Sequence, residues 1–269
     1  MKAVTGSARF GVRRLSASAR SLPQFLIIGA MRCGTTTLYR HLVNHSKLRS
    51  AYNKEVHYFD RNIERGLGWY RAFFPLRLLM PTGTITGEAT PYYLFHPRCP
   101  QRVADSLKEL RLIALLRDPV ERAFSHHQWA IGRGREWLSF EAALAAEEER
   151  LSGEQEKILE HPEYTSFTHQ VFSYKSRGHY AHQLERWFEK FDRESILILK
   201  SESLFTNPHA IIPEVLRFLN LPYEDLGPLP HRNMAAKQSI DPRTRADLCA
   251  HFEPHNRQLC DLLGWTESW

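Results

Sequence analysis

The sequence predicts an α/β fold of three layers, in which helices flank both faces of a central, mostly parallel sheet. The first observation is a short apolar run, Phe25–Ile28, which ends at Gly29 and is typical of a strand buried on both faces. The second is the return of such runs at intervals that are long enough for helical crossovers. With 269 residues, 42% of them hydrophobic, the chain can form one such domain with a full core.

Each further element follows from a local pattern. Leu38, Leu42 and Val43 recur at helical spacing after the first strand, so strand, loop and helix follow one another. Three more strands are predicted at 84–88, 112–116 and 196–199. Two apolar stripes predict helices that pack on the core, and their residues are Leu184, Trp187, Phe188 and Phe191 in the first and Leu248, Phe252, Leu259 and Leu263 in the second.

Two segments are predicted to lie outside this regular pattern. Residues 1–23 contain five basic and no acidic residues, which indicates a flexible basic arm before a single domain at 24–269, although an organelle transit peptide has a similar composition. The glutamate-rich stretch 140–163 is predicted to be a solvated helix and loop. The alternative is a mobile lid, inserted at about 135–177, over a substrate cleft.

Composition limits the classes of partner. The net charge of +6 favours an anionic partner: a nucleotide, a sulfated or carboxylated glycan, nucleic acid or an acidic membrane. No DNA- or RNA-recognition motif is present, so nucleic acid is not expected.

No apolar run reaches the roughly 18 to 20 residues of a membrane span, and we expect a cytoplasmic protein. Its cysteines are predicted to be reduced thiols because they form no CxxC pair, and they are Cys33, Cys99, Cys249 and Cys260.

The loop between the first strand and the first helix predicts phosphate binding. Gly29 and Gly34 have the spacing of a nucleotide P-loop, whose amides and helix N-terminus form an anion cradle. The P-loop lysine, which reaches the β- and γ-phosphates, is replaced by Thr35. Arg32 supplies a cation instead, and Thr35 to Thr37 supply hydroxyls, which suits a 5′-phosphate group without a γ-phosphate. Alone, the glycine spacing is equally typical of an ordinary turn.

Two other motifs carry chemistry. Arg117 follows a predicted strand and precedes a helix that begins at Pro119. This is the end of a strand at which α/β sheets bind ligands, so Arg117 and Ser125 suit a second phosphate. Glu55 is the first carboxylate of the chain, after ten lysines and arginines. In an extended segment Glu55 and His57 would point to the same side. A base and an imidazole could then converge on one substrate hydroxyl. Such a cluster alone is more often an ordinary polar surface.

In this order the three motifs resemble the sulfotransferase superfamily, which uses 3′-phosphoadenosine 5′-phosphosulfate (PAPS). The similarity is greatest to the branch of the heparan sulfate N- and 3-O-sulfotransferase domains and their bacterial relatives. The resemblance runs from about Phe25 to the C-terminus and implies a P-loop-like fold. It implies that the 5′-phosphosulfate is bound by Arg32, Cys33, Gly34, Thr35, Thr36 and Thr37. It also implies a 3′-phosphate site at Arg117 and Ser125, and a C-terminal donor loop at Arg232, Asn233 and Lys237.

The resemblance further implies in-line sulfuryl transfer to a glycan or small-molecule acceptor, without a metal, and release of adenosine 3′,5′-bisphosphate (PAP). Glu55 falls at the position of the family's general base. Arg32 falls at the position of the residue that supports the leaving oxygen. The resemblance implies an acceptor site at Lys54, His57, Asp60, Glu88 and Tyr92. The family usually has lysine at the position of Arg32, and the 3-O-sulfotransferases have lysine at that of Ala89. The alternatives are a P-loop kinase for a small metabolite and a non-catalytic protein of this fold that binds an anionic glycan.

Overall fold

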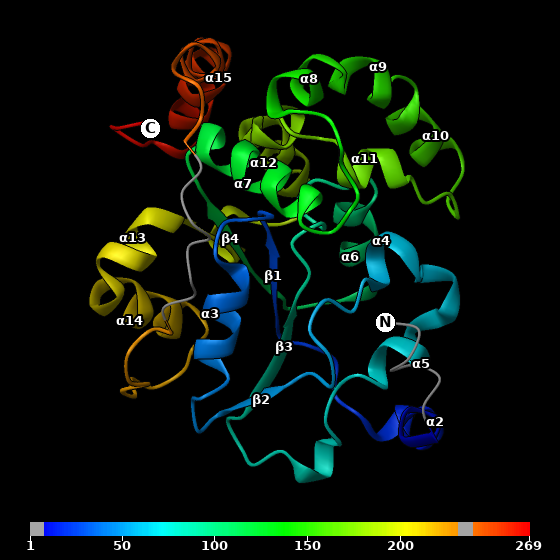
Figure 1. Cartoon of the computed structure of the whole chain (residues 1–269). Coiled ribbons are helices and arrows are strands. Elements are labelled where there is room, and N and C mark those ends of the chain that lie inside the picture. The colour runs from blue at the N-terminus through cyan, green and yellow to red at the C-terminus, as the bar shows by residue number, and fades with distance from the viewer. Residues whose placement is uncertain (1–7, 231–238) are drawn as a thin grey trace.

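In the computed structural model, which describes residues 8–230 and 239–269, five parallel strands form one sheet in the order β2-β3-β1-β4-β5 (Figure 1). Helices flank the sheet, so the predicted α/β class is confirmed. The strands are β1 (Phe25–Gly29), β2 (Leu48–Ser50), β3 (Ile85–Ala89), β4 (Arg111–Leu116) and β5 (Ile196–Lys200). The four predicted strands match β1, β3, β4 and β5 within a residue or so at their ends.

Strand β1 lies at the centre and is buried along its whole length. Phe25 is in register with Gly87 of β3 on one side and with Arg111 of β4 on the other. Burial on both faces explains why β1 and β4 read as continuous apolar runs. Strand β2 was not predicted, because this short edge strand has one buried residue, Leu48, followed by Arg49 and Ser50.

The helices form layers on both sides of the sheet and at one of its ends. Figure 1 shows α3, α13 and α14 on one side, α2, α4 and α5 on the other, and α7 to α12 with α15 as a layer at one end. Their bounds are α2 Ala8–Leu15, α3 Thr35–Leu42, α4 Tyr58–Arg61, α5 Gly66–Arg71, α6 Cys99–Ser106, α7 Pro119–Ile131, α8 Phe140–Ala145, α9 Glu147–Leu151, α10 Glu154–Glu160, α11 Phe167–Val171, α12 Tyr180–Phe188, α13 Ser201–Thr206, α14 Pro208–Phe218 and α15 Pro242–Leu263. Short 3₁₀ turns are η1 Ala17–Ala19, η2 Ile63–Arg65, η3 Arg77–Leu79, η4 Ser176–Gly178 and η5 Arg193–Ser195.

The core has two parts. The larger surrounds the sheet and includes the predicted stripe of α12, which ends at Phe188, so that Phe191 packs on the core from beyond the helix. The smaller lies between α7, α8 and α15, where Val120, Phe140 and Phe252 are buried together. Asp118 starts α7, because its carboxylate accepts hydrogen bonds from the amides of Val120 and Glu121.

The predicted flexible arm is wrong for the described part of residues 1–23. Residues 8–15 form α2, whose Phe10 is fully buried with its ring centroid 4.7 Å from that of Phe73. Arg13 donates hydrogen bonds to the carbonyl oxygens of Ala72 (2.6 Å) and Phe74 (2.8 Å). Arg13 therefore binds backbone oxygens just beyond α5, while Arg9 and Arg14 are exposed, and one apolar side chain anchors the helix.

The glutamate-rich segment is helical, but its description as a solvated helix and loop is only partly right. It forms α8, α9 and α10, and Glu148 and Glu149 are exposed as predicted. Glu147 is buried, and its carboxylate accepts hydrogen bonds from the amides of Lys175 (2.6 Å) and Ser176 (2.9 Å). Buried carboxylates are retained where donors pair with them, so this segment is anchored to η4.

All four cysteines are free thiols, as predicted. Within residues 8–230 and 239–269, none of the helices is both long enough and apolar enough to span a bilayer.

Candidate active site

The topology of the sheet brings the three sequence motifs to one edge. Strands β1 and β4 are neighbours, yet the chain leaves β1 toward β2 on one side and leaves β4 toward β5 on the other. Ligands of open α/β sheets bind at such a switch point, beyond the carboxyl ends of the strands. The glycine loop follows β1, and Arg117 follows β4. Glu55 comes to the same edge because its amide donates to the carbonyl of Ala89 (3.2 Å), the last residue of β3.

The loop after β1 has the conformation of an anion cradle. Gly34 starts α3 in the left-handed region, at φ 87°, and no side chain caps this helix. The amides of its first turn, Thr35 to Thr37, therefore point out of the helix, where its dipole favours an anion. Gly29 is required by close packing, because a Cβ atom there would lie 2.5 Å from the Cβ of Leu94.

The side chains of this loop differ in accessibility. Thr35 and Thr37 are buried, whereas Thr36 is half-buried. Cys33 is fully buried, and burial raises its pKa to about 11, so it stays a thiol. The Cys33 amide donates to the carbonyl of Ala30 (3.3 Å). The side chain of Cys33 is therefore closed off from a ligand, and its amide helps to shape the loop.

Arg32, Arg117 and Ser125, from three separate elements, lie together. Arg32 Nε donates to Ser125 Oγ (3.0 Å), and Arg117 Nη1 lies 3.4 Å from the carbonyl oxygen of Arg32. Burial lowers the pKa of Arg32, and the charge of Arg117 lowers it further. Two guanidinium groups so placed repel each other unless an anion lies between them. The nearby carboxylate is Glu121, 3.6 Å from Arg117 Nη2.

Two further arginines lie near the loop but were not predicted as site residues. Arg122 is fully buried, and its Nε and Nη1 have no hydrogen-bond partner within the described structure. Arg177 is 2% exposed, its Nη1 lies 3.1 Å from Met31 Sδ, and burial lowers its pKa to about 9. Arg122 lies three residues before Ser125 on α7, a spacing that could have identified it. Arg177 has no such signal, because only the packing of η4 brings it to the loop.

Glu55 and His57 converge, although by a different backbone than predicted. Both residues adopt left-handed conformations, with φ 61° and 55°, so the segment is not extended. Even so, His57 Nε2 lies 3.7 Å from Glu55 Oε2, and Lys54 Nζ lies 2.6 Å from Glu55 Oε1. The Glu55 side chain is 44% exposed and is therefore accessible to an acceptor.

Charges in this cluster set its protonation. Burial opposes ionisation of Glu55, but the nearby His57 and the charge and hydrogen bond of Lys54 lower its pKa to about 2. Burial likewise opposes a charge on His57, but Asp60, whose Oδ2 lies 2.7 Å from His57 Nδ1, raises the pKa of His57 to about 9. At neutral pH His57 is an imidazolium between two carboxylates. Asp60 itself is buried and bears on the site through His57.

Two residues predicted to contact an acceptor lie in the interior instead. Glu88 is fully buried and accepts hydrogen bonds from the hydroxyls of Tyr70 and Tyr93 (2.9 Å each) and from the amide of Val56 (3.2 Å). Tyr92 is 5% exposed, and its hydroxyl lies 2.8 Å from His169 Nδ1. Both therefore support the site from behind. Residue type alone did not reveal on which side of the backbone these side chains lie.

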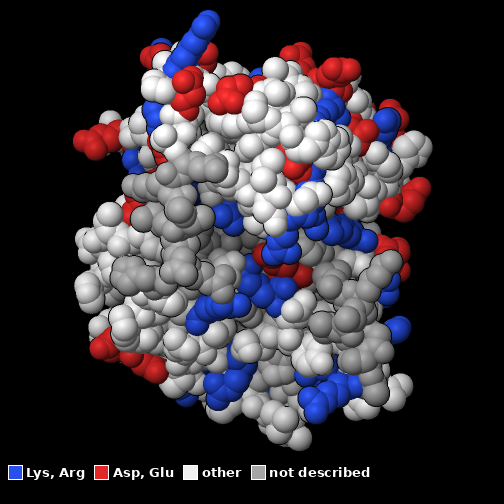
Figure 2. Space-filling model, viewed as in Figure 1, with Lys and Arg blue, Asp and Glu red and all other residues white. Residues whose placement is uncertain are grey.

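The surface agrees with an anion site. In Figure 2, lysine and arginine side chains gather across the middle of the viewed face, around a small acidic group in a hollow. Arg232, Asn233 and Lys237, the predicted C-terminal donor loop, lie outside the described residues.

Comparisons with known proteins point to one family. A family model described as a sulfotransferase domain matches residues 22–239. The membrane-associated sulfotransferase kil1 of Dictyostelium discoideum is 25% identical over 92% of this chain and 66% of its own length. Human heparan sulfate glucosamine 3-O-sulfotransferase 3A1 is 32% identical over 77% of this chain and 46% of its own. The chain thus spans two thirds or less of these curated relatives.

The fold has a counterpart among solved structures. A sulfotransferase from Alicyclobacillus acidocaldarius superposes with a TM-score of 0.70 at 28% identity, over 91% of this chain and 96% of that one.

Proposed function

Because the chain belongs to the sulfotransferase family, we propose that it transfers a sulfuryl group from PAPS to a hydroxyl or amine of a carbohydrate. The new bond joins sulfur to the acceptor oxygen or nitrogen. The bond between sulfur and the 5′-phosphate oxygen breaks, and PAP leaves. The proton of the acceptor passes to Glu55.

The observation that carries this proposal is the meeting of Arg32, Arg117 and Ser125 beside the uncapped start of α3. The loop amides suit the 5′-phosphosulfate, and Arg117 with Ser125 suits the 3′-phosphate. A kinase for a small metabolite would need a lysine that reaches a γ-phosphate. Thr35 occupies that position and is buried, which favours the PAPS assignment.

The residues of the site divide the chemistry between them. Glu55 is ionised at neutral pH and exposed, so it can accept the acceptor proton. His57, held by Asp60, would orient the acceptor. Arg32 and the amides of the loop would stabilise the charge that develops on the leaving phosphate oxygen. Placement and electrostatics would thus supply most of the rate enhancement.

A carbohydrate acceptor is supported by the human 3-O-sulfotransferase relatives, whose names specify heparan sulfate glucosamine. The positive face in Figure 2 suits an anionic glycan. Ala89, at the end of β3, lies where 3-O-sulfotransferases have lysine, so we do not assign their position of sulfation to this chain. A panel of glycans and small alcohols, incubated with labelled PAPS and read by mass spectrometry, would identify the acceptor.

Binding of PAP by the Arg117→Ala variant tests the donor site. Loss of a hydrogen bond to a charged phosphate costs about 1.5 to 3 kcal/mol, so calorimetry without magnesium should show roughly 10- to 150-fold weaker binding. Arg257→Ala is the matched control, because Arg257 is 69% exposed and pairs with Glu253 on α15. Equal PAP affinity in wild type and Arg117→Ala would refute the site, and a preference for ATP with magnesium would favour the kinase.

A further inference from the structure

Three histidines that take no part in the proposed transfer form a cluster between two helices. His251 and His255 lie one turn apart on α15, and His179 directly precedes α12. One ring nitrogen from each of the three lies within 4.8 Å of the others. Helices α12 and α15 pack against each other, so this arrangement joins residues more than 70 positions apart.

The spacing of the nitrogens is close to that of metal ligands. His179 Nε2 lies 3.0 Å from His251 Nε2. Nitrogens bound to one tetrahedral zinc ion at about 2.0 to 2.1 Å lie about 3.3 Å apart. The His179 and His255 rings stack with centroids 3.8 Å apart. A hydrogen bond thus joins His179 to His251, and stacking places the His255 ring against His179.

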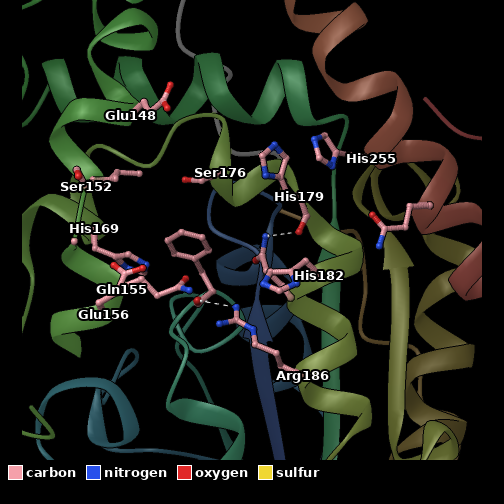
Figure 3. A pocket seen from close by; sticks show the side chains of 15 residues that line it. Glu148, Ser152, Gln155, Glu156, His169, Ser176, His179, His182, Arg186 and His255 are labelled. Atoms are coloured by element: carbon pink, nitrogen blue, oxygen red, sulfur yellow. Dashed lines mark hydrogen bonds between the residues drawn. The ribbon is translucent and has the colours of Figure 1, made fainter. Parts of the chain in front are cut away.

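The cluster also borders a cavity. His179 and His255 help to line a cavity of about 660 Å³, together with His169, His182 and Arg186. Figure 3 shows His179 and His255 side by side at its wall. Three histidine ligands with an open fourth position are typical of zinc sites that bind water or another small ligand.

The surroundings select the class of ion. The three ligand atoms are all imidazole nitrogens, one from each histidine. The cluster has no carboxylate. Magnesium and calcium, which prefer oxygen ligands, are excluded by this chemistry. Zinc, copper and nickel ions bind imidazole well.

We propose that His179, His251 and His255 form a binding site for Zn²⁺ or a similar divalent transition-metal ion, with a fourth coordination position toward the cavity. The ion would join the C-terminal helix α15 to the start of α12. The site shares no residue with the proposed donor and acceptor sites, so its failure would leave the proposed function untouched.

Titration of the untagged, EDTA-treated protein with Co²⁺ tests this site. One equivalent of Co²⁺ should produce the intense visible d–d bands of a tetrahedral centre, and Zn²⁺ should displace it. Addition of azide should shift those bands if the fourth position is open. A protein without such bands, or one with only a thiolate-to-cobalt charge-transfer band from the exposed Cys249, would overturn the proposal.

Variants assign the ligands. His251→Ala and His255→Ala should each bind Zn²⁺ at least about tenfold more weakly by calorimetry, which is the low end of the loss seen even for the groups that orient metal ligands. His182→Ala is the matched control, because its side chain on α12 is 66% exposed and lies outside the cluster. Zn²⁺ should raise the melting temperature of wild type and His182→Ala but not of His251→Ala. Equal Zn²⁺ affinity in all four proteins would refute the assignment.

Discussion

At the scale of single residues, the most informative group is the row Glu55, His57 and Asp60. His57 lies 2.7 Å from Asp60 and 3.7 Å from Glu55, and it carries a proton at neutral pH because both neighbours are carboxylates. Asp60 is buried and Glu55 is partly exposed. The row therefore holds one charged carboxylate at the surface in a defined position, where it can reach an acceptor proton.

Substitution of Glu55 tests its role as the base. General-base assistance contributes about 10² to 10⁴-fold, so Glu55→Gln should lower the rate of sulfate transfer from PAPS by that factor and leave PAP binding nearly unchanged. Glu64→Gln is the control, since Glu64 is 57% exposed and nearby in sequence. Rate measurements that show equal turnover in wild type and Glu55→Gln would exclude Glu55 as the base.

The raised pKa of His57 predicts how stability depends on pH. The folded pKa, about 9, exceeds the ordinary value of about 6.5. His57 therefore stabilises the fold fully below pH 6.5, and this contribution disappears as the pH rises through 9. The loss amounts to at most about 3 kcal/mol.

Urea unfolding at pH 6 and pH 10 measures this loss. The free energy of unfolding of wild type should fall more than that of His57→Gln, which lacks the titrating group. His182→Gln, changed at an exposed histidine, should follow wild type. If the free energy of unfolding falls by the same amount in wild type and His57→Gln between pH 6 and pH 10, the raised pKa of His57 is contradicted.

At the scale of elements, α9 shows how a charged segment can be part of the interior. Glu147, Glu148 and Glu149 are consecutive, but the first is buried and bonded to the amides of η4 and its preceding residue, whereas the other two are exposed. Helical periodicity turns one of three identical side chains inward. Because η4 carries Arg177 toward Met31, the anchoring of α9 also positions a cation near the phosphate loop.

Removal of this anchor should destabilise the protein. Glu147→Ala leaves the amides of Lys175 and Ser176 without their partner, at a cost of about 1 to 3 kcal/mol in the free energy of unfolding. Glu148→Ala, one residue along and exposed, should change it by less than about 0.5 kcal/mol. Denaturant titrations compare the two. If both variants unfold at the same denaturant concentration, the Glu147 contact contributes nothing.

At the scale of the whole molecule, helix α2 packs against parts of the chain that are distant in sequence. Helix α2 packs through Phe10 against Trp69, Phe73 and Tyr52. Trp69 lies on α5, Phe73 just beyond it and Tyr52 shortly after β2, all far from residue 10 in the sequence. The N-terminal helix is therefore part of the hydrophobic core of the domain.

Truncation of the anchoring side chain tests this arrangement. Phe10→Ala should lower the free energy of unfolding by about 3 to 5 kcal/mol, as for other large-to-small changes in a core. Val12→Ala, on the same helix but 65% exposed, should have little effect. A stability for Phe10→Ala equal to that of wild type would show that α2 is not docked in solution.

The sequence by itself determined the fold class, four of the five strands and the phosphate loop, because these depend on local patterns. Continuous apolar runs mark buried parallel strands, and the glycines of the loop have a fixed spacing from the helix they start. It also predicted site residues next to these patterns, namely Arg32, Arg117 and Ser125, and it predicted Glu55 and His57 from the first carboxylate of the chain. The rule that α/β sheets bind ligands beyond the carboxyl ends of their strands placed Arg117 at the ligand edge.

Tertiary structure alone decided which polar side chains lie inside and which distant residues meet. Glu88 and Tyr92 are polar in the sequence, but hydrogen bonds formed only in the fold keep them buried. Arg177 reaches the loop, and His179 reaches His255, across long stretches of chain. Contacts between distant residues depend on how helices pack, and no local pattern encodes that packing.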